Sequence, residues 1–481
     1  MLPVDALKNA VLDDHLVDYL TLVRLHGTPA AEVTRLQEYQ RARSAAHRES
    51  VASALAGNHS CHFLQDSANL VSVCVDYVMT GQAIESASPA QFSLEHDAQY
   101  PVVVRHVAVR YAANGRTLLN TPVSRFIKVQ LACACNALGA RKGFLVGKNG
   151  AWAEVDMLGA DKSVAQTAQT AAAWAHHVTA TAHQMSIDPP SDRRLYPNMC
   201  VTSQDPRAQA LKKELALQNH ELTLIRGIGV KHRNAALDAG MRSYEDPRVC
   251  AEVLNIRGAA ATVVDTILRA NQPLAGAQTT RTMSVMSGCM RGDVFIDIET
   301  LSFMSDDVPD MVFMVGLGYG TDTFECVRAP APTLDGERSV LDRMLAVLRK
   351  VRARRLIHWG AYEVCIFQKV QQRHGLDFMG EYEWVDMCKM VERSGFCPRN
   401  AFSFSLKSIV PAMYGLGMIG VVWDSSCTDG MEAMVGAYYA YMSNDAATLE
   451  RILNDIERYN LVDVVSTMQI WRYLYSRRIR I

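Results

Sequence analysis

The sequence predicts a multidomain α/β protein, and three observations lead to this fold class. At 481 residues, the chain is too long for one ordinary hydrophobic core. Its composition, with 49% hydrophobic and 21% charged residues, is that of a globular protein. Short β-like runs occur with helical patterns early in the chain and again from residue 293. We therefore expect an α/β domain at residues 1–190, a small helical segment at 191–280 and a second α/β domain at 288–481.

The charge balance restricts how the chain can bind a polyanion. Its 49 Lys and Arg residues nearly cancel its 50 Asp and Glu residues, giving a net charge of −1. A nucleic acid would therefore have to be bound through local basic patches. The opening run "MLPVDALKNAVLDDHLVDYL" carries acids and is not a signal peptide, and the Ala-rich run "SVAQTAQTAAAWAHHVTATAHQM" is too polar for a membrane span. We expect no membrane partner.

The 12 cysteines are scattered singly, apart from "ACACN" at 132–136. Neither a paired zinc spacing nor a four-cysteine iron–sulfur pattern occurs in the sequence. Without a secretory signal, this usage predicts reduced thiols in an intracellular protein that is not secreted. Most of the cysteines are expected to be small core residues.

The first domain is predicted from a helical start and a set of short strands. Residues 1–60 have a charged amphipathic pattern, and residues 61–160 contain β-like runs around the helical run "RFIKVQLACACNALGA". An Ala-rich helix at 163–187 then leads to a break, "DPPSDRRLYPNM".

A strand at 101–112, a helix at 125–139 and a strand at 143–147 resemble the RecB-like nucleases of the PD-(D/E)XK class, with Gln130 at the position of their helical glutamine. Where that class has an acid and a lysine, "VAVR" at 107–110 offers Ala108 and Arg110. The resemblance therefore implies a restriction-endonuclease-like domain that is catalytically inactive and kept for binding or assembly. A displaced acid, Glu154 or Asp156, is one alternative, and an unrelated α/β domain is another.

The middle segment contains "LTLIRGIGVKHRNAALDAGMRS" at 222–243, with short helical patterns on both sides of "GIG". A Gly-x-Gly turn can expose backbone N–H groups at a helix N-terminus, where they bind phosphate. The segment resembles a helix-hairpin-helix motif, which implies nucleic-acid binding by Gly227 and Gly229 through the backbone and by Lys231 and Arg233 through charge. The alternative is a packing unit with glycine at a helix C-cap.

The last domain begins with "RGDVFIDIET", a strand-like run that contains two acids. Strands are expected near 293–299, 311–319, 323–328 and 355–358, followed mainly by helices. Residues i and i+2 of a strand point to the same face, so Asp297 and Glu299 project into one site. Ionised carboxylates on one face repel each other unless a cation lies between them.

Two further stretches supply acids for the same site. "HWGAYEVCIF" places Glu363 in the first turn of a helix that follows a strand, where a carboxylate is favoured. The helical pattern at 452–474 places Tyr459 and Asp463 four residues apart on one face. An all-carboxylate site suits Mg²⁺ or Mn²⁺. Two such ions roughly 3.5–4 Å apart would support phosphodiester hydrolysis.

"DVFIDIET", "HWGAYE" and "YNLVD" resemble the three motifs of the DEDD superfamily of 3′–5′ exonucleases, in the subclass that uses Tyr. The resemblance covers roughly residues 290–478 and includes "SLKSIV" at 405–410. It implies a ribonuclease H-like mixed sheet flanked by helices. It also implies a role for each motif residue: the metal ligands would be Asp297, Glu299, Glu363 and Asp463, and Tyr459 would orient the attacking water.

Motif two departs from this family, which has Asp where the chain has Glu363. Asp386 in "EWVDMCKM" is a competing candidate, expected to be a structural acid on the following strand. Single motifs of this kind also occur by accident: a DxE pair can simply lie on the solvent face of an edge strand. All three motifs in order favour a metal site.

The sequence thus predicts a nuclease that needs two Mg²⁺ or Mn²⁺ ions and cuts DNA or RNA from a single-stranded 3′ end. The arrangement of domains resembles nucleases of bacteria and large DNA viruses, which implies the cytoplasm, the nucleus or a virion as its location. The alternative is a non-catalytic nucleic-acid-binding or scaffold protein built from decayed nuclease domains.

Overall fold

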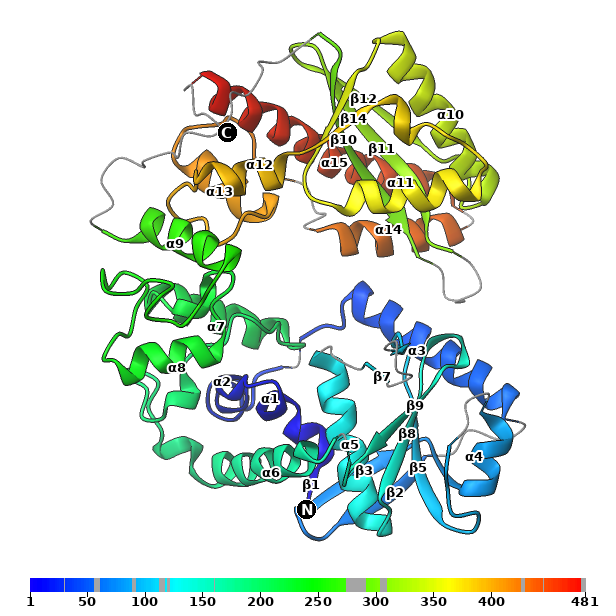
Figure 1. The fold of residues 1–481 in the computed structure, drawn as a ribbon, viewed down its shortest axis with the longest axis vertical. Helices are drawn as coiled ribbons and strands as arrows, with labels where there is room; N and C mark the ends of the chain where they lie inside the picture. Colours follow the sequence, from blue (N-terminus) through cyan, green and yellow to red (C-terminus); the bar gives the residue numbers. More distant parts are fainter. Residues whose placement is uncertain are drawn as a thin grey trace. The chain divides into compact units, whose positions relative to one another are not determined.

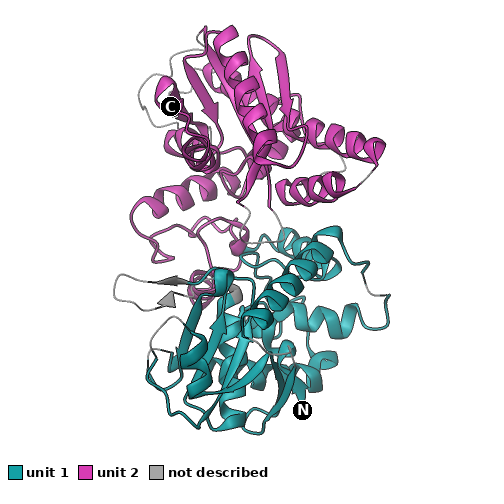
Figure 2. Cartoon of the chain, turned by 90° about the vertical axis from the view of Figure 1, so that its right-hand side faces the viewer, with its two compact units in different colours: residues 1–221, 304–307 teal, residues 222–303, 308–481 magenta. Residues whose placement is uncertain are grey.

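The computed structural model describes residues 1–29, 31–55, 61–88, 92–111, 117–118, 122–159, 161–273, 291–302, 309–424, 429–443 and 445–476 (Figure 1). It divides into two compact units, the first formed by Met1–Glu221 and the second beginning at Leu222 (Figure 2). Among the described helices, none has both the length and the apolar character needed to cross a bilayer.

Unit 1 contains a four-stranded mixed sheet in the order β4-β5-β8-β9, in which β5 and β8 are parallel and the other neighbours antiparallel. A smaller sheet has the order β1-β3-β2. The strands of these two sheets are β1 (Leu2–Pro3), β2 (His62–Asp66), β3 (Val71–Val75), β4 (Tyr77–Thr80), β5 (Gln99–Val104), β8 (Lys142–Val146) and β9 (Trp152–Asp156). Two further strands of two residues each, β6 (Arg110–Tyr111) and β7 (Thr117–Leu118), pair with each other in antiparallel orientation.

The central strand β5 is buried on both faces because helices cover the larger sheet. Val103 belongs to the core formed with α5 (Pro122–Leu138) and α6 (Ser163–Thr181). Its neighbours Val102 and Val104 belong to a second core, which also contains residues of α3 (Arg35–Ala54) and α4 (Gly81–Ala87). The remaining α-helices described in this unit are α1 (Lys8–Val11), α2 (His15–Tyr19) and α7 (Pro206–Gln218). The predicted α/β character of this region is confirmed.

The cysteines of unit 1 depart from the expectation in one place. Cys61 and Cys74 form a disulfide, with Cα atoms 6.1 Å apart, so the prediction of reduced thiols throughout is wrong for this pair. Cys133 and Cys135, by contrast, are buried free thiols in the core, as expected.

Unit 2 is built on a five-stranded mixed sheet in the order β12-β11-β10-β13-β14. The central strand β10 pairs antiparallel with β11 and parallel with β13. The strands are β10 (Asp293–Leu301), β11 (Met311–Tyr319), β12 (Thr323–Arg328), β13 (Arg355–His358) and β14 (Glu383–Asp386). The strands predicted at 311–319, 323–328 and 355–358 are confirmed, and the first strand extends two residues beyond its predicted end.

The long helix α15 (Ala446–Ser476) packs on β10 and β11 (Figure 1). Two glycines of β11 allow this close approach: a Cβ at Gly316 would overlap Asn460 Oδ1, and one at Gly318 would lie 2.5 Å from Met468 Sδ. The other helices of this part are α10 (Leu334–Lys350), α11 (Tyr362–Arg373), α12 (Met387–Ser394), α13 (Leu406–Gly415) and α14 (Gly430–Met442).

The middle segment predicted at 191–280 is divided between the two units: α7 belongs to unit 1, and the helices from Leu222 onward belong to unit 2. They are η6 (Leu222–Leu224), α8 (Val230–Asp238) and α9 (Ala259–Asn271). Their apolar side chains form one continuous core with residues of α12, α13 and the end of α15. Asn271, which is 2% exposed, donates to Ala401 O at 2.9 Å and accepts from Asn400 N at 2.8 Å.

Candidate metal centre

Three carboxylates meet where α15 crosses the central strand. Asp297 and Glu299 lie on the face of β10 that α15 covers, because Asn460 of that helix donates to Asp297 Oδ2 at 2.6 Å and also hydrogen-bonds Glu299. Asp463 lies one helical turn further along. One oxygen from each of these acids lies within 4.8 Å of the other two, and no other such group of potential metal ligands occurs among the described residues.

The three acids are electrostatically crowded. Burial raises the pKa of Asp297 well above its usual range, and the charges of Asp463 and Glu299 raise it further. Burial and the charge of Asp463 likewise raise the pKa of Glu299. Burial raises the pKa of Asp463 to about 6. Such a cluster binds a cation favourably, because a cation removes the repulsion and compensates for lost hydration.

Aromatic side chains hold Asp463 in place. Trp423 Nε1 donates to Asp463 Oδ1 at 3.0 Å, and the Tyr459 hydroxyl also hydrogen-bonds this carboxylate. The Lys407 ammonium lies 3.7 Å from the centre of the Trp423 ring and 4.1 Å from the centre of the Tyr459 ring. Its charge lowers the pKa of each acid in the cluster, opposing the effect of burial.

Glu363 lies in the first turn of α11, as predicted, but outside the group of three. It is 4% exposed, and its charge raises the pKa of each of the three clustered acids. Its Oε2 lies 3.5 Å from His358 Nδ1, which is 2.6 Å from Gly360 O and therefore directs its proton there. Glu363 Oε2 is thus buried without a hydrogen bond from any described residue.

Asp386, the competing candidate for motif two, has structural partners. It ends β14, accepts from Lys389 N at 3.1 Å as the N-cap of α12, and accepts from Gly360 N at 3.2 Å. This agrees with the structural role expected for it.

The donors of this site fit a divalent ion such as Mg²⁺ or Mn²⁺. All are hard carboxylate oxygens, and the orphaned oxygen of Glu363 could be satisfied by an ion or by water bound to one.

The hairpin residues have different environments. Gly227 has φ +96° and Gly229 is the N-cap of α8, where its N–H donates to His232 Nδ1 at 3.2 Å. Lys231 is exposed, but Arg233 is only 2% exposed. The expectation that Arg233 presents its charge to a ligand is therefore contradicted by its burial. Gly229 lies at the start of α8, whereas Gly227, with its positive φ, lies in the turn after η6, so a packing unit with a glycine after a helix end stays a prediction beside phosphate binding.

In unit 1, the polar residues that meet are not those expected. Strand β5 ends at Val104, so Ala108 lies beyond it. Arg105 instead donates to Asp76 Oδ2 at 2.7 Å and to Gln130 Oε1 at 3.0 Å. The single strand predicted at 101–112 is wrong, because β5 ends at Val104 and β6 is a separate strand at Arg110–Tyr111. Gln130 lies in the polar group with Arg105 and the buried Asp76.

The alternative acids of unit 1 form ion pairs. Glu154 pairs with Lys142 at 3.0 Å and Asp156 with Arg141 at 3.5 Å. Neither belongs to a group of potential metal ligands within the described part of the chain.

Three residues near the acids were not proposed as site residues from the sequence. Asn460 stands inside the quoted motif "YNLVD", three residues before Asp463, and helical spacing could have placed it on the same face. Lys407 stands inside "SLKSIV". Trp423 carries no local signal, because only the fold brings it to Asp463.

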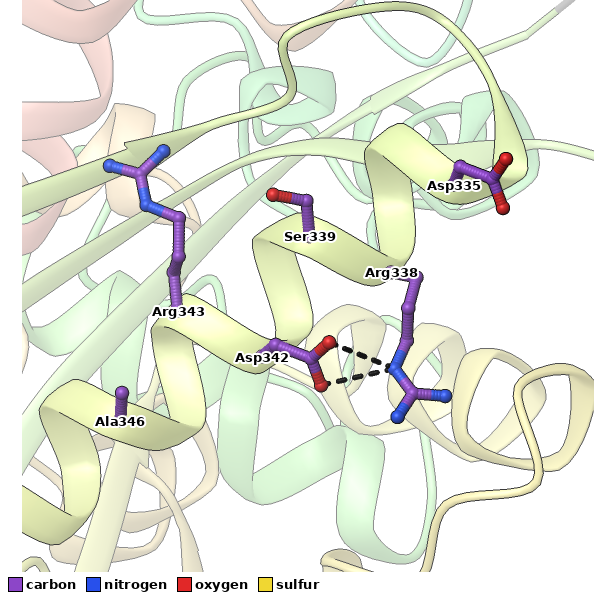
Figure 3. Close-up of a pocket in the computed structure, with 6 residues that line it drawn as sticks. All are labelled: Asp335, Arg338, Ser339, Asp342, Arg343 and Ala346. Carbon is purple, nitrogen blue, oxygen red and sulfur yellow. Dashed lines mark hydrogen bonds and ion pairs between the residues drawn. The ribbon is translucent and has the colours of Figure 1, made fainter.

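A surface hollow on α10 is unrelated to these residues. It is lined by Asp335, Arg338, Ser339, Asp342, Arg343 and Ala346 (Figure 3). Arg338 Nε is 3.0 Å from Asp342 Oδ1, an ion pair between successive turns of the helix. Because none of the clustered acids lines it, we assign it no part in the chemistry.

Comparison with known proteins identifies the fold of the last domain. Residues 294–475 match the family model of the ribonuclease H superfamily, so the C-terminal region carries a ribonuclease H-like domain. The chain is also similar to the family B DNA polymerase from the hyperthermophilic archaeon Pyrobaculum calidifontis, with 15% sequence identity and a TM-score of 0.29. That alignment covers 49% of this chain and 34% of the polymerase chain. No curated protein matches the sequence.

Proposed function

We propose that this chain, whose C-terminal region is a ribonuclease H-like domain, is a divalent-metal-dependent nuclease that hydrolyses DNA or RNA from a single-stranded 3′ end. The observation that carries the proposal is the group of three carboxylates with oxygens within 4.8 Å of one another. Crowded acids of this kind are costly in a protein unless they bind a cation.

The residues of the chain have separate tasks in this proposal. Asp297, Glu299 and Asp463 would hold the metal, and Glu363 would complete the site through its orphaned oxygen. When bound, Mg²⁺ or Mn²⁺ supplies a reactive water and stabilises the leaving oxygen.

The neighbouring side chains restrain this site. Asn460 holds Asp297, and Trp423 holds Asp463, so two of the carboxylates are oriented before substrate arrives. The Tyr459 hydroxyl, already hydrogen-bonded to Asp463, would position the attacking water.

The helical segment at the start of unit 2 would bind the nucleic-acid backbone. The exposed backbone at Gly227 and the exposed Lys231 are available for this role. The Gly229 N–H already donates to His232 Nδ1, and Arg233 supports the segment from inside.

Incubation with labelled strands tests the proposal. The purified chain is mixed with 5′-labelled single-stranded DNA or RNA in Mg²⁺, Mn²⁺ or EDTA, beside Asp297→Ala and a control, Asp455→Ala, from α15 outside the cluster. We expect a ladder that shortens from the 3′ end only with metal, and only in wild type and control.

The outcomes separate the candidate functions. Internal fragments in place of a ladder would show that the enzyme is an endonuclease and not an exonuclease. Binding of the strands without cleavage by the wild type, unchanged in Asp297→Ala, would refute the enzyme and leave a binding or scaffold protein.

A further inference from the structure

We propose that a pocket on unit 2 binds a phosphate monoester, the group found at a strand terminus or on a free nucleotide. The pocket has a volume of about 570 Å³ and lies between α9, the chain at 247–250 and the end of α12. None of the clustered acids lines it. The proposal therefore assigns a second ligand site, and it does not depend on the proposed cleavage.

One face of α9 supplies a polar wall of this pocket. Four residues of the helix line the pocket at spacings of three and four: Thr262, Asp265, Thr266 and Arg269. Arg269 Nε donates to Asp265 O at 3.1 Å, and Arg269 Nη2 donates to Thr266 Oγ1 at 3.5 Å. These two bonds hold the guanidinium in place, and its further N–H donors remain for a ligand.

A second cation comes from α12. Arg393 lies in the last turn of this helix, is exposed and lines the pocket. Within the described part of the chain, no residue forms a hydrogen bond or an ion pair with its guanidinium. The one acid of the lining, Asp265, accepts from Ala251 N at 2.7 Å and is ion-paired with neither arginine. The pocket thus has two positive charges and one negative charge.

The walls of the pocket are held together without a ligand. Gln272 Nε2 donates to Asp246 O at 3.1 Å and to Val249 O at 3.0 Å, which ties this part of the chain to the end of α9. Val249 belongs to the same core as Val391 of α12. Because the walls are already ordered, a ligand would bind with little cost in conformational entropy.

The two guanidinium groups suit a phosphate monoester. Arginine donates in a fixed fork that matches the oxygens of phosphate. A monoester carries about −1.5 to −2 charges at pH 7, so it can use two arginines more fully than a singly charged backbone phosphate can. The exposed Thr262, on the same face of α9 as Arg269, adds a hydroxyl donor. The volume is that of a site for a small ligand and leaves room for an attached sugar.

The test compares probes that differ in one phosphate. Isothermal titration calorimetry compares adenosine 5′-monophosphate with adenosine. Fluorescence anisotropy compares 3′-labelled single-stranded DNA that has a 5′-phosphate with the same strand that has a 5′-hydroxyl. All titrations of the full chain contain EDTA, so that no metal in the carboxylate cluster can bind phosphate.

The variants are Arg393→Gln, Arg269→Gln and Arg393→Lys. Arg399→Gln is the control, because Arg399 is exposed nearby in the sequence but does not line the pocket. Arg269 and Arg393 are both exposed, so the variants should fold, and melting curves check this.

We expect the wild type to bind the phosphate-bearing member of at least one pair about tenfold more tightly than its partner, because charge-assisted hydrogen bonds are gained. A preference within the adenosine pair alone would assign the site to a free nucleotide, and one within the strand pair alone to a strand terminus. Arg393→Gln and Arg269→Gln should each lose most of the preference. Arg393→Lys should keep part of it, and Arg399→Gln all of it.

A wild type that binds both members of each pair equally would overturn the proposal. A preference that persists in Arg393→Gln and in Arg269→Gln would also overturn it, and would leave the arginines the structural task of facing the carbonyl ends of α9 and α12. Equal weakening of both strands by Arg393→Gln would replace it by a contact with the strand backbone. If Arg393→Gln does not fold, Arg269→Gln decides. Cleavage enters none of these measurements, so the pocket and the proposed nuclease can fail separately.

Discussion

Replacing Asp463 by Asn should stabilise the metal-free protein while weakening its metal binding. The Asn side chain keeps an oxygen that can accept from Trp423 Nε1, so the local packing is retained. What it removes is a negative charge buried beside Asp297 and Glu299. The proposed cation site should therefore lower the stability of the protein when no cation is bound.

The magnitude follows from the pKa of Asp463, which burial raises from 3.8 to about 6. A rise of about two pH units corresponds to ~3 kcal/mol of unfolding free energy. The folded state binds the proton of the Asp463 carboxyl more tightly than the unfolded state does. The protein is therefore more stable at about pH 4, and this contribution to the free energy of unfolding is lost as the pH rises through 6. Asn does not ionise and avoids this cost.

Urea unfolding in EDTA measures the effect. At pH 8 we expect the free energy of unfolding of Asp463→Asn to exceed that of the wild type by up to ~3 kcal/mol, and at about pH 4 the two free energies should agree. Asp455→Asn, on α15 outside the cluster, should change stability by less than about 0.5 kcal/mol. Addition of Mn²⁺ should stabilise wild type and the control but have much less effect on Asp463→Asn.

An Asp463→Asn variant that is no more stable than wild type at pH 8 in EDTA would refute the reasoning. The carboxylates would then not be crowded, and the main support for a cation site would be lost.

Three further predictions follow from the same contacts. In EDTA, the melting temperature of the wild type should fall as the pH rises from about 4 to 8, because burial raises the pKa of all three acids. Addition of Mg²⁺ should raise the melting temperature more at pH 8 than at pH 4. A melting temperature that does not change with pH in calorimetry would contradict this. Gly316→Ala should displace Asn460, lower the free energy of unfolding by about 1–3 kcal/mol and abolish cleavage. Gly380→Ala, which has open space around it, should change neither the stability in denaturation assays nor the cleavage in nuclease assays. Arg105→Met should cost unit 1 roughly 1–3 kcal/mol in urea, because Asp76 loses its ion pair, and should leave cleavage unchanged; a drop in cleavage would implicate unit 1 in the chemistry.

Periodicity predicted much of the last domain. The alternation around Asp297 and Glu299 placed both acids on one face of a strand, and helical spacing placed Tyr459 with Asp463. These are local relations, because strand and helix geometry determine which nearby residues share a face. The hydrophobic runs of β11, β12 and β13 could be delimited for the same reason.

Other features depend on packing between distant segments and could not be predicted. Trp423 reaches Asp463 across 40 residues of chain, and nothing near either residue indicates this contact. Arg233 follows an exposed Lys231, yet it points inward. In unit 1, the end of β5 is set by Asp76, which accepts from Val104 N at 2.8 Å, and the run of valines gave no sign of that limit.

The shared core of unit 2 determines how the ribonuclease H-like region can be separated from the rest of the chain. A fragment cut to the matched region, beginning near residue 294, would lose Leu222–Ala270 and with them close to half of the buried side chains in that core. The apolar faces left on α12 and α13 would meet water and promote aggregation. A fragment that contains this half of the molecule should therefore begin upstream of Leu222, so that η6, α8 and α9 continue to cover the apolar faces of α12 and α13.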